Sequence, residues 1–156
     1  MEKQFKKNCQ MSMEKIKVVL VDLSGTLHIE NQLVPGSIEA LRKLRNSGLY
    51  MIKFVTNTTK ESKSSLLRLV NSLGLEIERN ELFTSLTAAR NLIDKKLLRP
   101  YLFLEDEALE DFEGVDVSNP DAVVIGLAPD KFDYTHMNTA FRLFLPVFRF
   151  DRRRTD

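Results

Sequence analysis

Cysteine, tryptophan and long apolar stretches are scarce or missing in this chain of 156 residues. Cys9 is its one cysteine, which excludes an internal disulfide and a zinc site built from cysteines. No stretch approaches the roughly 20 apolar residues that cross a bilayer, and the polar N-terminus lacks the apolar segment of a signal peptide. We therefore expect a cytosolic protein with no membrane partner.

An excess of charge of one sign is missing too. Lysine and arginine number 23 against 22 aspartates and glutamates, which gives a formal net charge of +1. This balance gives no overall reason to expect a nucleic acid partner. Basic residues gather at both ends, where we interpret them as solvated tails: Lys3, Lys6, Lys7, Lys15, Lys17, Arg149, Arg152, Arg153 and Arg154.

Two apolar segments in the first half are predicted strands. Residues 16–21 are apolar on both faces, which is typical of a central strand in a parallel sheet covered by helices. Residues 50–55 are a second apolar strand. Asp22 ends the first segment, and the polar run TNTTK follows the second. An isolated aspartate at a strand end more often only marks a turn, so its meaning depends on the residues near it.

Helical apolar spacing follows each of these strands. Residues 35–48 and 59–74 both have it, and the second helix is expected to begin with Thr58 or Thr59 as its cap. Strand, helix, strand and helix begin a doubly wound α/β fold, in which a right-handed crossover makes the two strands parallel.

A second α/β series is expected from about residue 81. It has a helix, a strand, an acidic turn, a strand and a last helix, at residues 85–96, 101–104, 104–113, 121–128 and 133–145. The chain then divides into a polar leader at 1–15, a first α/β part at 16–80, a second at 81–145 and a basic tail at 146–156.

Attack on phosphorus is the chemistry that Asp22 suggests. A carboxylate on a rigid strand end, followed by a tight turn whose amides face the same crevice, suits a nucleophile that forms an aspartyl-phosphate. Parallel topology brings Thr56 to the same sheet edge, where such folds bind ligands. Mg²⁺ would neutralise the phosphate, while the Thr56 hydroxyl and the amides near Thr59 hold its oxygens.

Four segments resemble a known superfamily: DLSGTLHIENQLVPGSIEALRKLR, FVTNTTKESKSSLLRLV, LFTSLTAARNLI and DAVVIGLAPDKFDYTHMNTAFRLF. They resemble the haloacid dehalogenase superfamily, in the branch whose cap domain is inserted after the second motif. The resemblance runs from about residue 16 to about residue 145. It implies an α/β fold: the N-terminal part of a Rossmann-like, parallel-sheet core, followed by an incomplete α/β cap domain.

The resemblance also implies a Mg²⁺-dependent phosphatase that acts on a small phosphorylated substrate. Asp22 would be the nucleophile and a metal ligand, and Ser24 a further catalytic position whose backbone carbonyl binds the metal. The implied phosphate-binding positions are Gly25, Thr26, Thr56 and Asn57.

Two departures from the family pattern are expected to affect activity. Most of these phosphatases carry a second aspartate, the general acid and base, where this chain has Ser24. General acid–base help is worth about 10²–10⁴-fold, so we expect poor hydrolysis of alkyl esters and a preference for phosphoramidate or pyrophosphate bonds. The family's later lysine motif and acidic pair come after the cap, and we expect this chain to lack them. Asp130 and Asp133 belong to the cap, where Asp133 is expected to cap a helix.

The expected lack of the later family strands has a folding consequence. Residues 16–21 would form an unpaired apolar edge, which invites association, so we expect the chain alone to be marginally stable or self-associating. A non-catalytic, truncated variant that pairs with a full-length copy, or a homodimer, through the cap is the alternative function. A receiver-type phosphoacceptor is disfavoured, because it needs an acidic pair at the end of an earlier strand.

Other conspicuous residues receive structural interpretations. His28, in the loop after the nucleophile turn, and His136, on the last helix, are expected at the surface. The acidic turn is interpreted as a solvated helix face, since its spacing matches no calcium loop. The aromatic residues near the end suggest a packing or partner surface: Phe141, Phe144, Phe148 and Phe150.

Overall fold

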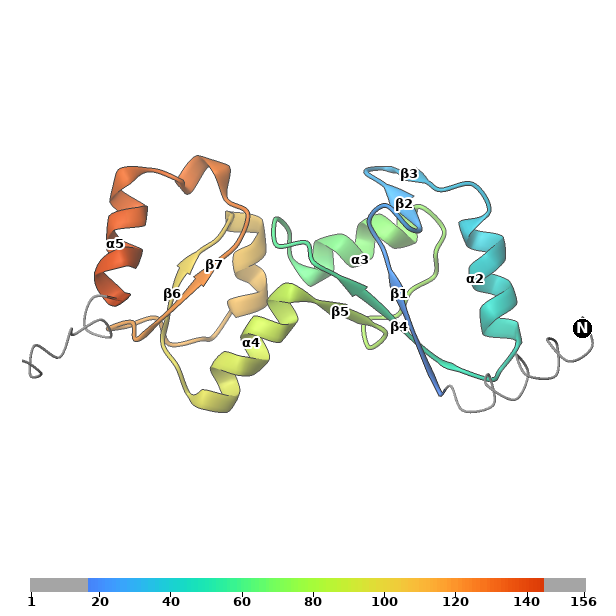
Figure 1. The fold of residues 1–156 in the computed structure, drawn as a ribbon, viewed down its shortest axis with the longest axis horizontal. Coiled ribbons are helices and arrows are strands. Elements are labelled where there is room, and N and C mark those ends of the chain that lie inside the picture. The colour runs from blue at the N-terminus through green and yellow to red at the C-terminus, as the bar shows by residue number, and fades with distance from the viewer. Residues whose placement is uncertain (1–16, 145–156) are drawn as a thin grey trace, which may run out of the picture. The chain divides into compact units, whose positions relative to one another are not determined.

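A computed structural model describes residues 17–144, so the predictions for the leader and the basic tail lie outside the described residues (Figure 1). The chain forms two compact units. Unit 1 contains the described residues up to Asn57 together with Leu66–Phe83, and unit 2 contains Thr58–Ser65 and the residues from Thr84 onward. Among residues 17–144, no helix has both the length and the apolar character needed to cross a membrane.

The sheet of unit 1 is built from β1 (Val18–Asp22), β4 (Met51–Thr56) and β5 (Leu82–Thr84), in the order β1-β4-β5. Strands β1 and β4 are parallel, with Asp22 opposite Val55. The two predicted strands and their parallel arrangement are therefore confirmed. Strand β5 was not predicted, because three residues are too few to show a periodic pattern.

Among residues 17–144, strand β1 is the outermost strand of this sheet, beside β4. The prediction that it is covered on both faces is wrong for the described residues. Val18 is 44 % and Leu20 65 % exposed, whereas the residues between and after them are half-buried. One face of β1 thus packs on the core and the other, which also carries Asp22, is open.

Unit 1 also contains helix α2 (Ser37–Asn46) and the short hairpin of β2 (His28–Ile29) and β3 (Gln32–Leu33). Helix α3 (Lys63–Ser72) belongs to unit 1 from Leu66 onward, and its first three residues belong to unit 2. The first helix lies within the predicted segment 35–48 but starts at Ser37, after Gly36, whose φ of +83° favours glycine. The second starts later than predicted. The core of unit 1 is a single apolar cluster: Leu23, Leu27, Leu41, Ile52, Phe54, Leu66, Val70, Leu75, Ile77 and Leu82.

Unit 2 contains a two-stranded parallel sheet of β6 (Pro100–Phe103) and β7 (Ala122–Ile125). Its helical elements are α4 (Ser85–Lys96), η1 (Asp106–Phe112), η2 (Pro129–Lys131) and α5 (Tyr134–Phe144). The expected order of helix, strand, acidic turn, strand and helix is confirmed. Thr84 caps α4, because its hydroxyl accepts a hydrogen bond of 3.0 Å from the Thr87 amide.

Candidate active site

Asp22 is the last residue of β1, and its side chain is exposed. The Thr26 hydroxyl donates a hydrogen bond of 2.9 Å to Asp22 Oδ2. No other hydrogen bond to this carboxylate comes from the described residues. Oxygen Oδ1 is therefore the one left available for an outside partner.

A tight loop fixes the backbone after Asp22. The buried Leu23 anchors it, and its carbonyl accepts hydrogen bonds from the amides of Thr26, Leu27 and His28, at 3.2, 2.9 and 3.3 Å. Gly25 has a φ of +82°, the left-handed conformation that suits glycine. Its amide donates to the His28 carbonyl at 2.7 Å. The amides of Gly25 and Thr26 are thus engaged inside the loop, and the Thr26 side chain holds the carboxylate.

Thr56 and Asn57 lie at the end of the neighbouring strand. Thr56 is the last residue of β4 and is 7 % exposed, on the strand face that also carries Ile52 and Phe54. Asp22 is paired with Val55, one residue earlier. Asp22 and Thr56 are therefore the last residues of adjacent parallel strands, at the carboxyl end of the sheet. Their side chains point to opposite faces of the sheet. Asn57 follows as an exposed residue at the same edge.

The prediction that the second helix begins at Thr58 or Thr59 is wrong. Helix α3 begins at Lys63, and its first turn is capped by Ser62, whose hydroxyl accepts from the Ser65 amide at 3.2 Å. The Lys63 amide donates to both carboxylate oxygens of Asp111, at 3.1 Å each. An anion site at this helix start is therefore already filled by a side chain of the protein.

Two residues of the acidic turn contact the start of α3. Asp111 caps α3, and Glu110 Oε2 accepts a hydrogen bond of 2.7 Å from the Ser62 hydroxyl. The interpretation of the turn as a solvated face is therefore wrong for Asp111, which is half-buried, whereas Glu110 remains exposed. Within residues 17–144, no group of three or more histidine, cysteine, aspartate or glutamate side chains is arranged to hold a metal ion.

His28 is buried, at 3 % exposed, and the prediction of a surface histidine is wrong. Its imidazole Nδ1 lies 2.8 Å from the Glu30 carbonyl oxygen, in the turn of the β2–β3 hairpin. A carbonyl only accepts, so Nδ1 carries the proton. Nε2 is buried and has no hydrogen-bond partner among the described residues. The hairpin turns this side chain inward, which the sequence pattern does not show.

Asp133 caps α5, as predicted. Its Oδ1 accepts from the His136 amide at 2.8 Å, and its Oδ2 lies 2.7 Å from His136 Nδ1. The bond from the His136 amide, followed by that from the imidazole, lowers the pKa of Asp133. His136 lies at the surface of unit 2, as expected.

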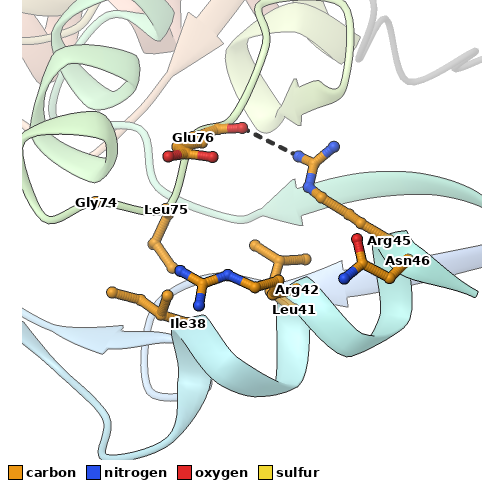
Figure 2. A pocket seen from close by; sticks show the side chains of 8 residues that line it. All are labelled: Ile38, Leu41, Arg42, Arg45, Asn46, Gly74, Leu75 and Glu76. Atoms are coloured by element: carbon orange, nitrogen blue, oxygen red, sulfur yellow. Dashed lines mark hydrogen bonds between the residues drawn. The ribbon is translucent and has the colours of Figure 1, made fainter.

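A pocket of about 150 Å³ in unit 1 lies away from these residues (Figure 2). Helix α2 lines it on one side and the segment Gly74–Glu76 on the other. The Arg45 guanidinium at its border donates from Nη2 to the Glu76 carbonyl at 3.1 Å. None of the candidate catalytic residues lines this pocket, so it is not the phosphoryl site.

These observations agree with comparisons to known proteins. The family model described as "Haloacid dehalogenase-like hydrolase" matches residues 19–118, so the chain belongs to this family. The chain is 58 % identical over 130 residues to haloacid dehalogenase-like hydrolase domain-containing protein 2 of Bos taurus, covering 83 % of this chain and 50 % of that protein. It is 34 % identical over 137 residues to phospholysine phosphohistidine inorganic pyrophosphate phosphatase of Danio rerio, covering 85 % and 50 %. The chain thus spans about half the length of the curated relatives it matches.

Solved structures show the same fold. A 4-nitrophenylphosphatase from Thermotoga maritima superimposes with a TM-score of 0.73 at 25 % identity, covering 85 % of this chain and 52 % of that one. A glycerol phosphate phosphatase from Mycobacterium tuberculosis, solved in complex with magnesium, gives 0.69 at 21 % identity, covering 87 % and 43 %. The parallel-sheet α/β core expected from the sequence is therefore confirmed.

Proposed function

We propose that this chain carries the nucleophile of a Mg²⁺-dependent phosphohydrolase site, and that Asp22 becomes phosphorylated. The observation that carries the proposal is the exposed Asp22 carboxylate at the carboxyl end of β1, with Oδ2 held by Thr26. Family membership and the relatives described as phosphatases support it. A small phosphorylated molecule is the proposed substrate, and the cytosol the proposed location.

The mechanism uses the fixed loop after β1. Asp22 Oδ1 attacks phosphorus, the bond to the leaving group breaks, and the leaving group departs with the bonding electrons. Water then attacks the phosphorus of the aspartyl-phosphate, which releases phosphate and restores the carboxylate. Thr26 keeps Oδ2 in place during both steps, and Thr56 and Asn57 at the same edge are proposed to contact the phosphoryl group.

The residues present fit a magnesium ion in part. Mg²⁺ takes one or two carboxylates with waters and other oxygen ligands. The Asp22 carboxylate and the Ser24 backbone carbonyl are oxygen donors two residues apart at the strand end, and we propose both as ligands. When bound, the ion would neutralise charge on the phosphoryl group.

Phosphate release with and without Mg²⁺ tests the proposal. The unchanged chain and Asp22→Asn should be compared on p-nitrophenyl phosphate, pyrophosphate and a phosphoramidate. Release that needs Mg²⁺ and falls to the buffer rate in Asp22→Asn is expected, because an amide is not a nucleophile for phosphorus. Equal background rates from the two proteins would favour the non-catalytic alternative.

Ser24 is proposed to shift the substrate preference toward bonds whose leaving group needs no protonation by an acid. Ser24→Asp restores a general acid and base and should raise hydrolysis of alkyl phosphate esters by about 10²-fold or more, with a smaller gain on phosphoramidate. The measured quantity is the ratio of the two kcat/KM values. An unchanged ratio would contradict the proposed role of Ser24.

Exposed apolar residues on α5 favour a second candidate, a binding partner for a full-length copy through the cap. Tyr134, Met137 and Phe141 line one hollow of about 290 Å³ on that helix. Co-purification of the tagged chain with a full-length copy should be lost in Phe141→Lys. Retention of the copy by that variant would exclude this surface.

A further inference from the structure

The buried imidazole of His28 has a ring nitrogen without a hydrogen-bond partner among residues 17–144. The side chain is 3 % exposed, and Nδ1 donates to the Glu30 carbonyl at 2.8 Å, which leaves Nε2 as a buried acceptor. A buried acceptor without a partner costs stability. An apolar side chain such as leucine would occupy this position without that cost, so packing alone does not explain a histidine here.

The bond from Nδ1 holds a turn whose backbone is strained. Glu30 has a φ of +49°, in the left-handed region that residues other than glycine rarely adopt. It lies in the turn between β2 and β3, where the ladder consists of two register pairs. A hairpin this short is marginally stable by itself. The bond from His28 therefore supplies a contact that keeps the turn in its shape.

The backbone of the same residue is bonded to the loop that follows Asp22. The His28 carbonyl accepts from the Gly25 amide at 2.7 Å, and the His28 amide donates to the Leu23 carbonyl at 3.3 Å. Thr26 follows Gly25 directly, and its hydroxyl donates to Asp22 Oδ2 at 2.9 Å. A short series of contacts thus runs from the imidazole through the hairpin and the loop to the proposed nucleophile.

We propose that His28 is a positioning residue for Asp22. Its imidazole holds the Glu30 carbonyl, the turn holds the loop after β1, and the loop keeps the carboxylate in place for attack on phosphorus. This inference rests on the proposed function, because it concerns the nucleophile of that site. All the bonds involved join residues within 22–30, so a longer chain could surround the hairpin without replacing them.

Two substitutions at position 28 separate positioning from packing. His28→Leu keeps an apolar side chain in the core and removes the unpartnered Nε2, but it has no donor for the Glu30 carbonyl. His28→Asn is smaller, but its side-chain amide offers a donor close to the place of Nδ1. A packing role therefore favours the leucine variant, and a positioning role favours the asparagine variant. Ser37→Ala is the matched control, because the Ser37 hydroxyl in α2 is also buried without a partner among the described residues.

Native-state hydrogen exchange at the Gly25 amide is the first measurement, with circular dichroism as the check of folding. Loss of one hydrogen bond changes an opening equilibrium by about tenfold, and an acceleration of that size is expected in His28→Leu. Exchange in His28→Asn and in Ser37→Ala should stay close to that of the unchanged chain. Acceleration in the asparagine variant would overturn the proposal, even where the leucine variant fails to fold. So would an unchanged rate in a folded leucine variant.

Mg²⁺-dependent hydrolysis of p-nitrophenyl phosphate is the second measurement. In His28→Leu, kcat should fall by about tenfold or more with a smaller change in KM, because a misplaced nucleophile slows the chemical step more than it weakens substrate binding. His28→Asn should keep kcat near that of the unchanged chain, and an equal fall in both variants would contradict the proposal. If the unchanged chain releases no phosphate, the proposed function fails, while exchange at Gly25 still decides whether His28 holds the loop.

Discussion

Arg45 and Glu81 form the best-defined ion pair of unit 1. Arg45 Nη1 donates to Glu81 Oε1 at 2.8 Å and Nη2 to Oε2 at 2.7 Å, which is the bidentate geometry of strong ion pairs. The guanidinium also lies over the Phe54 ring, 5.8 Å from its centroid. The pair links α2 to the residue that precedes β5, 36 positions later in the chain.

Acid should weaken this pair. Burial raises the pKa of Glu81, but the hydrogen bond from Arg45 and smaller contributions outweigh it, so the folded pKa lies below the ordinary value of 4.5. A lowered carboxyl pKa stabilises the fold above about pH 4.5, and that stability is lost as the pH falls through the folded pKa.

Glu81→Gln tests the contribution of the pair. The change should lower the free energy of unfolding at pH 7 by about 1–2 kcal/mol, near the lower end for charged hydrogen bonds because Arg45 is partly exposed. The loss should shrink as the pH falls below about 4.5. Urea unfolding at several pH values measures it. Glu39→Gln, which breaks the exposed pair with Lys43, should change little and serves as control.

At the scale of elements, α3 shows how a distant residue determines where a helix begins. Thr58 and Thr59 have the chemistry of caps, yet the helix begins at Lys63 because Ser62 and Asp111 satisfy its first amides. The Thr59 hydroxyl instead accepts a hydrogen bond of 2.8 Å from the Leu127 amide. Asp111 is 48 positions away from the amide that it caps.

Asp111→Ala should destabilise the protein by about 1 kcal/mol, the typical value for a lost helix cap. Asp111→Asn should cost less, because the amide oxygen still accepts hydrogen bonds. Denaturant midpoints measure both changes. Glu107→Ala, an exposed change in the same η1 segment, is the control, and an equal loss there would contradict a capping role for Asp111.

At the scale of the whole molecule, the apolar cores are separate. The cluster around Phe54 lies in unit 1, and the clusters around Leu104 and Phe103 lie in unit 2. No residue of the described chain belongs to two of these clusters. A defect in one core should therefore loosen one unit more than the other.

Phe54→Ala should show this separation. Phe54 is fully buried, and loss of a buried phenylalanine costs about 3–5 kcal/mol. Native-state hydrogen exchange should accelerate at the amides of β1 and β4 and remain slow at those of β6 and β7. Equal acceleration in both sheets would show that the units open together.

The sequence by itself determined the features that depend on local pattern. Continuous apolar runs predicted β1 and β4, the helical spacing predicted α2 and α4, and the parallel topology placed Asp22 and Thr56 at one sheet edge. These features follow from backbone geometry and from which faces are apolar. They need no knowledge of distant contacts, and the motif residues were sufficient to indicate the family.

Only the tertiary structure decided the features that depend on residues far apart in the sequence. The start of α3 depends on Asp111, the inward position of His28 depends on the hairpin turn at Glu30, and β5 exists because β4 lies beside it. The same holds for the open face of β1, because exposure of an apolar strand depends on which neighbours pack against it. The local sequence pattern determines which face of a helix or strand a residue occupies. The fold determines which residues it contacts there.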